Sequence, residues 1–492
     1  MKTLSVEEAP LLPIAICLVA GILTGFNIDA SISMYPFLVV MAVLAFFLRK
    51  KPVAHTLTIV VATMLLGMVI AQREHRISHG YGYDGHERMC NVVITSELVE
   101  KHKTVAVDAV NVENGQRLKC YVHKDSFSMK LMPGNGLRIR ACIEGLSDDE
   151  KASDYDRYLL RQGYAGRCFV KAEHWEYSNL KLDKLSVVTR AQIRFLQWRH
   201  QLLERYRMAD VSGDAYAVVA AMTLGDKTML NDDLRDTYSI SGASHVLALS
   251  GMHLGIICCL LMMLTMSRRH PRVLSQSLLV IGIWGFAFLV GLPTSVVRSA
   301  LMISIFAVFS LGYRIHMSVN LLCLAAVIIL LCSPYAVYDV GFQLSFAAVM
   351  SIVVLMPMFF VERNPSFFVG CMGVSLAAQV GVAPIIAYHF GRFSTYFLLT
   401  NLVVVPAAYA IICGAFLTLL FPPLSIVVAW TVNILNTILT MITRMPLASI
   451  EGLHPSMVQV ALYYVFVAVM LAAYLIWKGY YPKSVNRWYK SS

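Results

Sequence analysis

Long apolar runs, many of them about as long as a membrane-crossing helix, recur along most of the chain. A helix needs about 20 mostly apolar residues to cross a bilayer, and about twelve segments approach that length. Several are short or interrupted, which predicts some discontinuous spans. The predicted spans begin near Leu11, Ser33, Val53, Ser244, Ser275, Ser295, Ser318, Val340, Phe367, Tyr396, Leu424 and Met457. The pattern predicts a polytopic α-helical membrane protein.

One long polar interval, from about Arg73 to Arg207, interrupts this pattern and has the length of a compact domain. Its middle contains five short segments with strand-like patterning and many β-branched residues. They cover Val92–Val99, Thr104–Val112, Leu118–Val122, Gly136–Ile143 and Ala165–Ala172. In the link Glu113–Gln116, the pair Asn114-Gly115 predicts a two-residue hairpin with a type I′ turn. Short strands with such turns predict a small OB-like barrel, and a β-sandwich is the alternative.

The segment between the polar domain and the later spans is basic and aromatic. Arginines and apolar residues interleave at helical spacing up to Arg207, which is typical of an amphipathic helix at a membrane surface. The alternative is a pore entrance, where Arg190, Arg194, Trp198 and Arg199 would contact phosphates and bases. The predicted domains are therefore an N-terminal membrane unit (1–72), the β-rich domain (73–183), an interfacial helix (184–209), a second membrane domain (210–480) and a basic tail (481–492).

Composition and charge agree with a membrane protein and predict its orientation. The chain is 57% hydrophobic and 14% charged, which excludes an ordinary soluble domain. Arg49, Lys50 and Lys51 follow the second predicted span, and basic residues favour cytoplasmic loops. With twelve spans, cytoplasmic loops would also hold Arg268, Arg269, Arg272, Arg314, Arg363 and the basic residues from Lys478 to Lys490. We therefore expect a multi-pass membrane protein with both termini in the cytoplasm and the β-rich domain outside.

Four of the eleven cysteines, Cys90, Cys120, Cys142 and Cys168, lie in the polar domain. If that domain faces an oxidising compartment, they would form up to two disulfides, and the sequence does not decide the pairing. Free thiols within strands are equally compatible with the sequence.

The segment Ser241–His253 places two histidines, several hydroxyls and two glycines at the head of an apolar run. Polar side chains at membrane depth are costly and usually line a cavity or path. On a continuous helix His245 and His253 would point in similar directions, while Ser250 and Gly251 would lie off that line. The histidines would then line or support a polar path, or simply make interhelical hydrogen bonds. The glycines indicate close packing or a helix break.

Arg298 stands about one turn inside an apolar segment, just after Gly291-Leu292-Pro293. An unpaired arginine there would cost several kcal/mol, roughly 3 or more, so it must find an anion, a carboxylate or water. A phosphate would suit its forked donors, and an ion pair with Asp339 or Asp226 is the structural alternative. Gln343 likewise would contact a substrate or join two helices.

Four separated motifs carry a family resemblance. They are Leu224–Asp226, His245–His253, Gly291–Ala300 and Asp339–Phe346. Their order and spacing resemble the ComEC competence proteins, the inner-membrane channels for transforming DNA in bacteria. A weaker match over Asp154–Gly163 resembles the family's extracytoplasmic segment, although Asp148–Lys151 replaces the usual Asn-Pro-Gly.

The resemblance implies a channel for single-stranded DNA and no enzymatic activity, cofactor or metal. The residues expected to line or support its path are Asp226, His245, Ser250, Gly251, His253, Arg298, Asp339 and Gln343. Many relatives carry a further metallo-β-lactamase-like domain, whose His-x-His-x-Asp-His motif is missing from this sequence. The expected partners are single-stranded DNA, membrane lipid, a DNA receptor, a separate nuclease, and a cytosolic translocase or strand-binding proteins.

Two other functions stay open at this stage. An intramembrane hydrolase would use Ser250 with His253 or His245, although residues i and i+3 of one helix rarely give attack geometry. A secondary transporter for a small polar solute would be expected to show paired repeats with matched broken helices, and the sequence has no convincing internal repeat.

Overall fold

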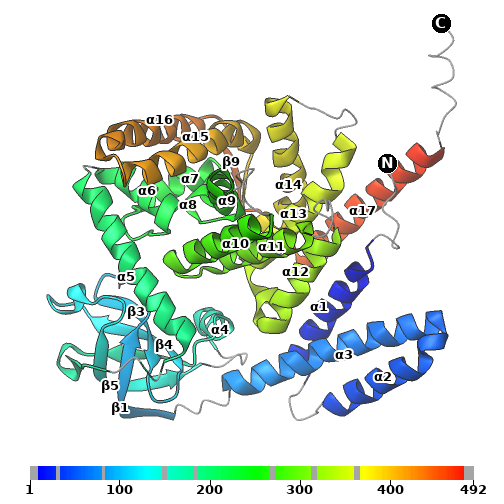
Figure 1. Ribbon diagram of the computed structural model, residues 1–492, viewed down its shortest axis with the longest axis horizontal. Helices are drawn as coiled ribbons and strands as arrows, with labels where there is room; N and C mark the ends of the chain where they lie inside the picture. Colours follow the sequence, from blue (N-terminus) through cyan, green and yellow to red (C-terminus); the bar gives the residue numbers. More distant parts are fainter. Residues whose placement is uncertain are drawn as a thin grey trace, which may run out of the picture.

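The computed structural model describes residues 9–28, 34–79, 84–146, 152–180, 183, 185–209, 211–265, 272–311, 319–359 and 366–480. Helices make up most of it, and a small β-barrel lies at one side of the helical bundle (Figure 1). Several residues used above lie outside this part of the chain. They are Ser33, Lys184, Arg268, Arg269, Arg314, Ser318, Arg363, the segment Asp148–Lys151 and the predicted tail 481–492.

Three N-terminal helices form one corner of the molecule, α1 (Leu11–Asn27), α2 (Tyr35–Phe47) and α3 (Pro52–His79) (Figure 1). α3 packs against both of the others. Glycines bring α1 and α3 into backbone contact, because a Cβ atom at Gly67 would lie 2.6 Å from the carbonyl oxygen of Leu18. Small residues at such interfaces allow membrane helices to approach closely.

The remaining helices form the main bundle. After the barrel come α5 (Val187–Met208), α6 (Gly213–Leu224), α7 (Asp232–Ile240), α8 (Ser244–Leu247), α9 (Gly251–Thr265), α10 (Arg272–Leu289), α11 (Thr294–Ser310), α12 (Val319–Cys332), α13 (Val340–Phe359), α14 (Phe367–Phe390), α15 (Phe397–Thr418), α16 (Ser425–Thr443) and α17 (Met457–Tyr480). α5 leads from the barrel to α6 (Figure 1).

Seven helices in the described ranges are long and apolar enough to cross a membrane: α3, α10 and α13–α17. α1, α6, α9, α11 and α12 are apolar but shorter. Each predicted span has a helix beginning within a few residues of its predicted start, so the positions of the helices are confirmed. The count of about twelve spans is not confirmed.

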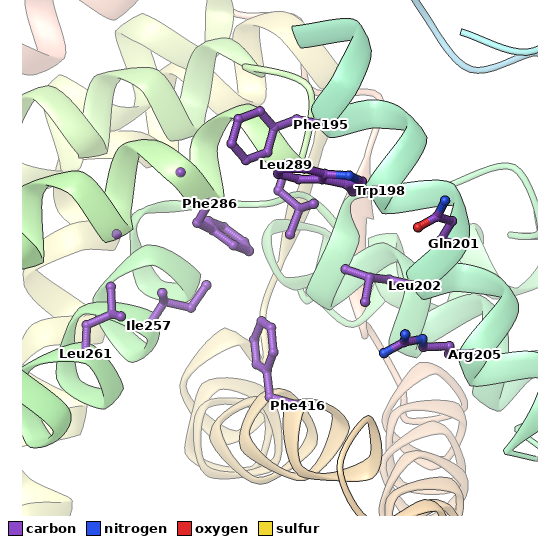
Figure 2. A pocket seen from close by; sticks show the side chains of 12 residues that line it. Phe195, Trp198, Gln201, Leu202, Arg205, Ile257, Leu261, Phe286, Leu289 and Phe416 are labelled. Carbon is purple, nitrogen blue, oxygen red and sulfur yellow. The ribbon is translucent and has the colours of Figure 1, made fainter. Parts of the chain in front are cut away.

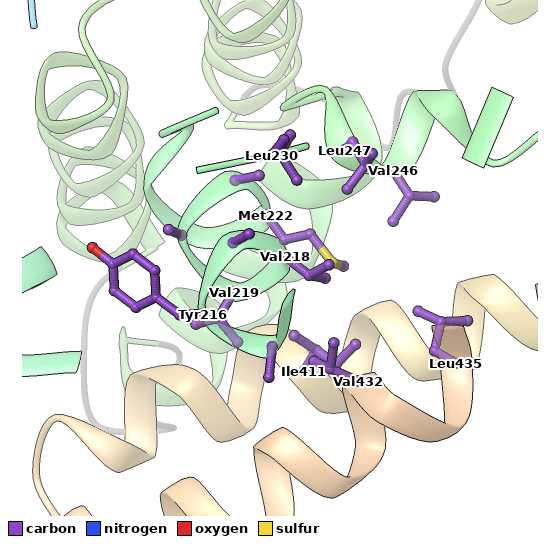
Figure 3. Close-up of a cluster of buried hydrophobic side chains, with 14 of the residues drawn as sticks. Tyr216, Val218, Val219, Met222, Leu230, Val246, Leu247, Ile411, Val432 and Leu435 are labelled. Carbon is purple, nitrogen blue, oxygen red and sulfur yellow. The ribbon is translucent and has the colours of Figure 1, made fainter. Parts of the chain in front are cut away.

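α6 was not predicted as an element of its own, and it forms the centre of the largest apolar core. Its residues Ala215–Leu224 are all buried, and α15 and α16 pack against it. Figure 3 shows Val218 and Val219 of α6 near Ile411 and Val432 from those two helices. A helix that is apolar on every side is buried on every side. Because α6 has 12 residues, its apolar run is too short to be recognised in the sequence as a membrane-spanning helix.

The polar domain is a closed β-barrel. Its strands are β1 (Asp84–Ile94), β2 (Val99–Glu100), β3 (Thr104–Asn111), β4 (Arg117–His123), β5 (Gly136–Gly145), β6 (Gly166–Val170) and β7 (Trp175–Tyr177). The order β1-β3-β4-β6-β5 closes because β1 also pairs with β5, and only the β4–β6 pair among these is parallel. The OB-like barrel is confirmed, and the sandwich alternative is wrong.

The predicted two-residue hairpin between β3 and β4 is wrong. Asn111 donates to the carbonyl of Gln116 and accepts from Gly115, which encloses a four-residue loop, 112–115. Gly115 has a φ of 74°, whereas Asn114 is not among the described residues with positive φ. A type I′ turn requires positive φ at both central residues, so the Asn-Gly pair here closes a longer loop.

The four described cysteines of the barrel form no disulfide in this structure. Cys120 and Cys168 lie opposite each other on β4 and β6, both buried, with their sulfur atoms 3.3 Å apart. Cys90 lies opposite Ile139, and exposed Cys142 lies opposite Glu87. Disulfide formation therefore stays a prediction. Of the possible pairings, the positions of the sulfur atoms favour Cys120 with Cys168.

We expect Cys120 and Cys168 to be protected together from alkylation when the protein is isolated from its native membrane without reductant. Alkylation under denaturing conditions followed by mass spectrometry would show an unmodified pair that becomes modified after reduction. The exposed thiol of Cys142 serves as the internal control and should be alkylated in both samples. Full alkylation of Cys120 and Cys168 without reductant would contradict the pairing.

Candidate functional site

The apolar segment that begins at Ser244 is a broken helix. α8 ends at Leu247, Ala248 is extended with a ψ of 127°, and α9 begins at Gly251. The break confirms the expected discontinuity at this glycine. It also overturns the inference that His245 and His253 share one face of a continuous helix, because they lie on different helices.

Ser250 and His253 cap the N-terminus of α9. The backbone N–H and the hydroxyl of Ser250 lie 3.3 and 3.0 Å from Nδ1 of His253. An N–H can only donate, so Nδ1 accepts and the ring proton is assigned to Nε2. The pair resembles a capping box in which histidine replaces the usual glutamate. Nε2 is buried and has no hydrogen-bond partner among the described residues.

His245 belongs to α8 and differs from His253 in its surroundings. Its Nδ1 lies 3.1 Å from the carbonyl oxygen of Gly242, and its side chain is exposed, whereas His253 is buried. α8 lies among the helices of the main bundle (Figure 1). Of the two histidines, His245 is therefore the one placed to meet a solute or water.

The start of α11 packs directly against the break. Ser295 donates from its hydroxyl to the free carbonyl of Leu249 at 2.6 Å. A Cβ atom at Gly251 would lie 3.1 Å from the hydroxyl of Ser299, so glycine permits this close approach. The carbonyl of Leu249 and the N–H of Ser250 thus both have partners at the break, and α11 brings Arg298 to the same region.

Arg298 is 5% exposed and pairs with Asp339 across a distance of 3.5 Å between Nη1 and Oδ1. The same carboxylate oxygen accepts the backbone N–H of Phe342 at 2.7 Å and so caps α13. Nε of Arg298 has no hydrogen-bond partner among the described residues. The guanidinium is therefore paired but not saturated, and its Nε–H can donate to a further acceptor.

Asp226, the other carboxylate considered for Arg298, has a local role. Its Oδ1 accepts from the backbone N–H and the hydroxyl of Thr228, at 3.0 and 2.8 Å. The turn just after α6 therefore uses this carboxylate, and the ion pair of Arg298 is formed with Asp339.

Gln343 joins three elements. Its amide donates to the carbonyl of Val337 at 2.9 Å, and its oxygen lies 3.1 Å from Nε2 of His389 on α14. His389 was missed from the sequence, although an ionisable residue near the end of an apolar run is a signal that would have found it. We call His245, Ser250, His253, Ser295, Arg298, Asp339, Gln343 and His389 the polar cluster.

The barrel domain touches the edge of the polar cluster. Arg161, at the end of α4 (Asp154–Arg161), lies with its guanidinium carbon 4.4 Å from the ring centre of Tyr338. Tyr338 directly precedes Asp339. The segment that includes α4 therefore connects the barrel to the site in the bundle.

The residues predicted at a pore entrance separate into two environments on α5. Arg190, Arg194 and Trp198 are exposed at four-residue intervals and form one face. Arg199 is 7% exposed, and its electrostatic neighbours include Glu97 of the barrel. The exposed three remain candidates for contact with a ligand, while Arg199 stabilises the junction of barrel and bundle.

Glu97 is the carboxylate of this junction. Its Oε1 is buried without a hydrogen-bond partner among the described residues. Burial raises the pKa of Glu97, and the nearby Arg199 partly opposes that rise. Because the folded state then binds the proton more tightly, this group's contribution to stability is greatest in acid and decreases as the pH rises through the raised pKa.

We expect Glu97→Gln to remove the pH-dependent contribution of this carboxyl group to stability. The melting temperature of the purified variant should then vary less with pH than that of the wild type. Thermal unfolding in detergent over a series from acidic to neutral pH would measure it. Glu100→Gln is the matched control, because Glu100 is exposed on the neighbouring strand. Identical pH profiles for Glu97→Gln and the wild type would contradict the assignment.

The fold and the site together define a polytopic helical membrane protein with an OB-like barrel and a polar cluster at a helix break. The chain belongs to the competence protein family, whose model, described as "Competence protein", matches residues 222–478. In the described residues, no group of three or more His, Cys, Asp or Glu side chains is arranged to hold a metal ion.

Three relatives show the extent of the similarity. ComE operon protein 3 of Bacillus subtilis (strain 168) is 29% identical over 336 residues, covering 65% of this chain and 41% of the relative. An uncharacterized protein of Aquifex aeolicus (strain VF5) is 27% identical, covering 52% and 58%. Competence protein ComA of Neisseria gonorrhoeae is 29% identical, covering 32% and 24%. The chain thus matches less than two thirds of each relative's length. No solved structure matches the chain.

Proposed function

We propose that this protein is an inner-membrane channel that conducts single-stranded transforming DNA into the cytoplasm. The observation that carries the proposal is the polar cluster, which links a helix break to an incompletely saturated arginine within an apolar bundle. Polar groups at such depth usually mark a path for a polar solute. Membership of the competence protein family supports a role in DNA uptake.

In the proposed orientation both termini are cytoplasmic, the chain spans the membrane about twelve times, and the barrel lies outside. The barrel and the exposed face of α5, with Arg190, Arg194 and Trp198, receive the strand. Arginine attracts phosphate, and an aromatic side chain stacks on bases without regard to sequence. Contact between Arg161 and Tyr338 couples this outer part to the cluster.

Within the bundle we assign different tasks to the cluster residues. Arg298 has a free donor on Nε and is the candidate for a transient phosphate contact. His245 is exposed and contacts the passing strand or its water, while Ser250, Gly251 and His253 maintain the break. Asp339 orients Arg298, and Gln343 holds α13 against α14. A receptor, a nuclease and a cytosolic translocase or strand-binding proteins would complete the system.

The test is uptake of end-labelled double-stranded DNA by the source bacterium, with the gene deleted or restored. Label that resists external nuclease and behaves as single-stranded DNA measures arrival in the cytoplasm, and nuclease-sensitive label measures DNA held outside. We expect deletion to remove the protected single strands and leave surface binding intact. Unchanged protected DNA in the deletion strain would disprove the channel.

The contact between Ser250 and His253 favours one second candidate, an intramembrane serine hydrolase. A hydroxyl 3.0 Å from an imidazole nitrogen is the contact that an activated serine needs. The second ring nitrogen has no partner among the described residues, so the usual third, orienting group is not found there. Labelling of the membrane-embedded protein with a fluorophosphonate probe decides between the two. Labelling at Ser250 that His253→Gln abolishes would support the hydrolase and contradict the structural role given to this pair.

A further inference from the structure

A cavity of about 510 Å³ opens between α5, α9, α10 and α15 (Figure 2), and no residue of the polar cluster lines it. Its size falls in the range of about 300–1,000 Å³ found for small-molecule sites. Phe195 and Leu202 of α5, Leu261 of α9, Phe286 and Leu289 of α10 and Phe416 of α15 supply apolar walls. We call this cavity the α5 groove.

The polar groups of the α5 groove are confined to one helix. Gln201 and Arg205 stand one turn apart on α5, and both are exposed. Figure 2 shows the guanidinium of Arg205 turned inward, toward Phe416. Among the described residues no carboxylate forms an ion pair with Arg205, whereas the neighbouring Arg207 pairs with Glu204. One edge of an apolar groove therefore offers an uncompensated cation and an amide donor.

Two glycines of α10 shape the floor. A Cβ atom at Gly282 would lie 2.8 Å from Leu261, so this glycine lets α9 pack closely. A Cβ atom at Gly285 would meet no atom within 4 Å, so the space beside Gly285 is open groove. A side chain placed at position 285 would enter the cavity without first displacing a neighbour.

This chemistry matches a phospholipid better than nucleic acid. Two of the groove's walls, α10 and α15, are helices long and apolar enough to lie in a bilayer. An acyl chain can fill an apolar groove there, and its phosphate can meet Arg205 at the edge. A DNA strand would need cations along its length, and the groove lining holds one.

We propose that the α5 groove binds one acyl chain of an anionic membrane phospholipid, with Arg205 and Gln201 holding the phosphate. The bound lipid fixes the C-terminal half of α5 against α9, α10 and α15. α5 is also the helix that leads from the barrel to the bundle, so the lipid stabilises the position of the barrel (Figure 1). The site is separate from the polar cluster and does not depend on the channel function, although it shares Trp198 with the face of α5 proposed to receive DNA.

The test uses the full chain reconstituted in phosphatidylethanolamine vesicles that contain phosphatidylglycerol with a photoreactive diazirine in one acyl chain. After irradiation, mass spectrometry locates the labelled peptides. We expect labelling of α5 and α10 around the groove to fall about tenfold in Gly285→Leu, the change that corresponds to about 1.4 kcal/mol of lost binding. Gly370→Leu on α14 is the control, because a Cβ there also meets no atom within 4 Å.

The headgroup contact is tested in the same vesicles. Arg205→Gln should reduce labelling of the groove, while Lys103→Gln, which removes one exposed charge from the barrel, should leave it unchanged. Equal melting temperatures of the variants in detergent show that they fold. Two results would overturn the proposal. One is groove labelling no stronger than labelling of the exposed α17, and the other is photolabelling of the groove by a single-stranded oligonucleotide that Gly285→Leu prevents.

Discussion

Replacing Asp339 with asparagine is expected to destabilise the protein by about 3–5 kcal/mol and to remove most DNA uptake, although the change is nearly isosteric. Asparagine can still accept the backbone N–H of Phe342, so the cap of α13 is kept. The substitution removes the negative charge of Asp339 that pairs with Arg298, and Arg298 is only 5% exposed. A buried arginine without its carboxylate must draw in water or move.

A double-mutant cycle with Arg298→Gln separates the pair from its individual members. If the two residues form one unit, the double variant should be much less destabilised than the sum of the single variants. Thermal and denaturant unfolding in detergent measure stability, and the protected-DNA assay measures uptake. Asp226→Asn is the control for a buried carboxylate in a local turn, with hydrogen bonds to Thr228. Additive losses at 298 and 339 would contradict the coupling.

The cycle also distinguishes a structural arginine from one that contacts DNA. In the exchange variant Arg298→Asp with Asp339→Arg, a purely structural pair would recover uptake and the stability that comes from the ion pair, although the cap of α13 by Asp339 is lost. If Arg298 presents Nε to a phosphate, the exchange should recover stability in part and uptake hardly at all, because the guanidinium then extends from position 339, just before α13, instead of from α11. Full recovery of uptake would disprove the phosphate contact without disproving the channel.

Substituting Gly21 with valine is expected to separate α1 from α3 and cost about 3 kcal/mol, the upper end for overpacked sites. A Cβ atom at position 21 would lie 2.0 Å from the carbonyl oxygen of Met64 and 2.8 Å from its carbonyl carbon. These are backbone atoms, so no change of rotamer relieves the clash. Even Gly21→Ala should be destabilised, since the Cβ atom alone makes the contact.

Gly370→Val provides the comparison, because a Cβ atom at position 370 would meet no atom within 4 Å. Both variants should be expressed from the same vector and compared by fluorescence-detected gel filtration and melting temperature in detergent. We expect a lower melting temperature for Gly21→Val and little change for Gly370→Val. Equal melting temperatures would show that α1 and α3 do not pack through this glycine.

Much of the secondary structure was predictable because apolar periodicity reflects which surfaces are buried. The five predicted barrel strands overlap β1, β3, β4, β5 and β6, and the predicted spans match helices. The failures have local causes. The Asn-Gly pair before β4 closes a four-residue loop, and α6 is shorter than the length used to recognise a span. The strand β7 has three residues, too few to show the alternation of apolar and polar positions by which a strand is recognised in a sequence.

The candidate site was predictable in its residues but not in its connections. A polar side chain in an apolar run is conspicuous, which identified His245, His253, Arg298, Asp339 and Gln343. Which carboxylate pairs with Arg298 depends on how α11 packs against the start of α13, and no local pattern reports that. The partnership of Gln343 with His389 joins residues 46 positions apart and was not foreseen.

From the sequence alone came the class of the protein, the place of its inserted domain and most of the residues of the candidate site. These follow from hydrophobic periodicity and from the high cost of polar groups in a bilayer. The tertiary structure alone decided that the barrel closes, that Ser250 and His253 cap a broken helix, and that Arg298 pairs with Asp339. It also decided that four helices leave a groove beside Gly285. Such features arise where segments distant in the chain pack together, and local patterns in the sequence do not encode which segments those are.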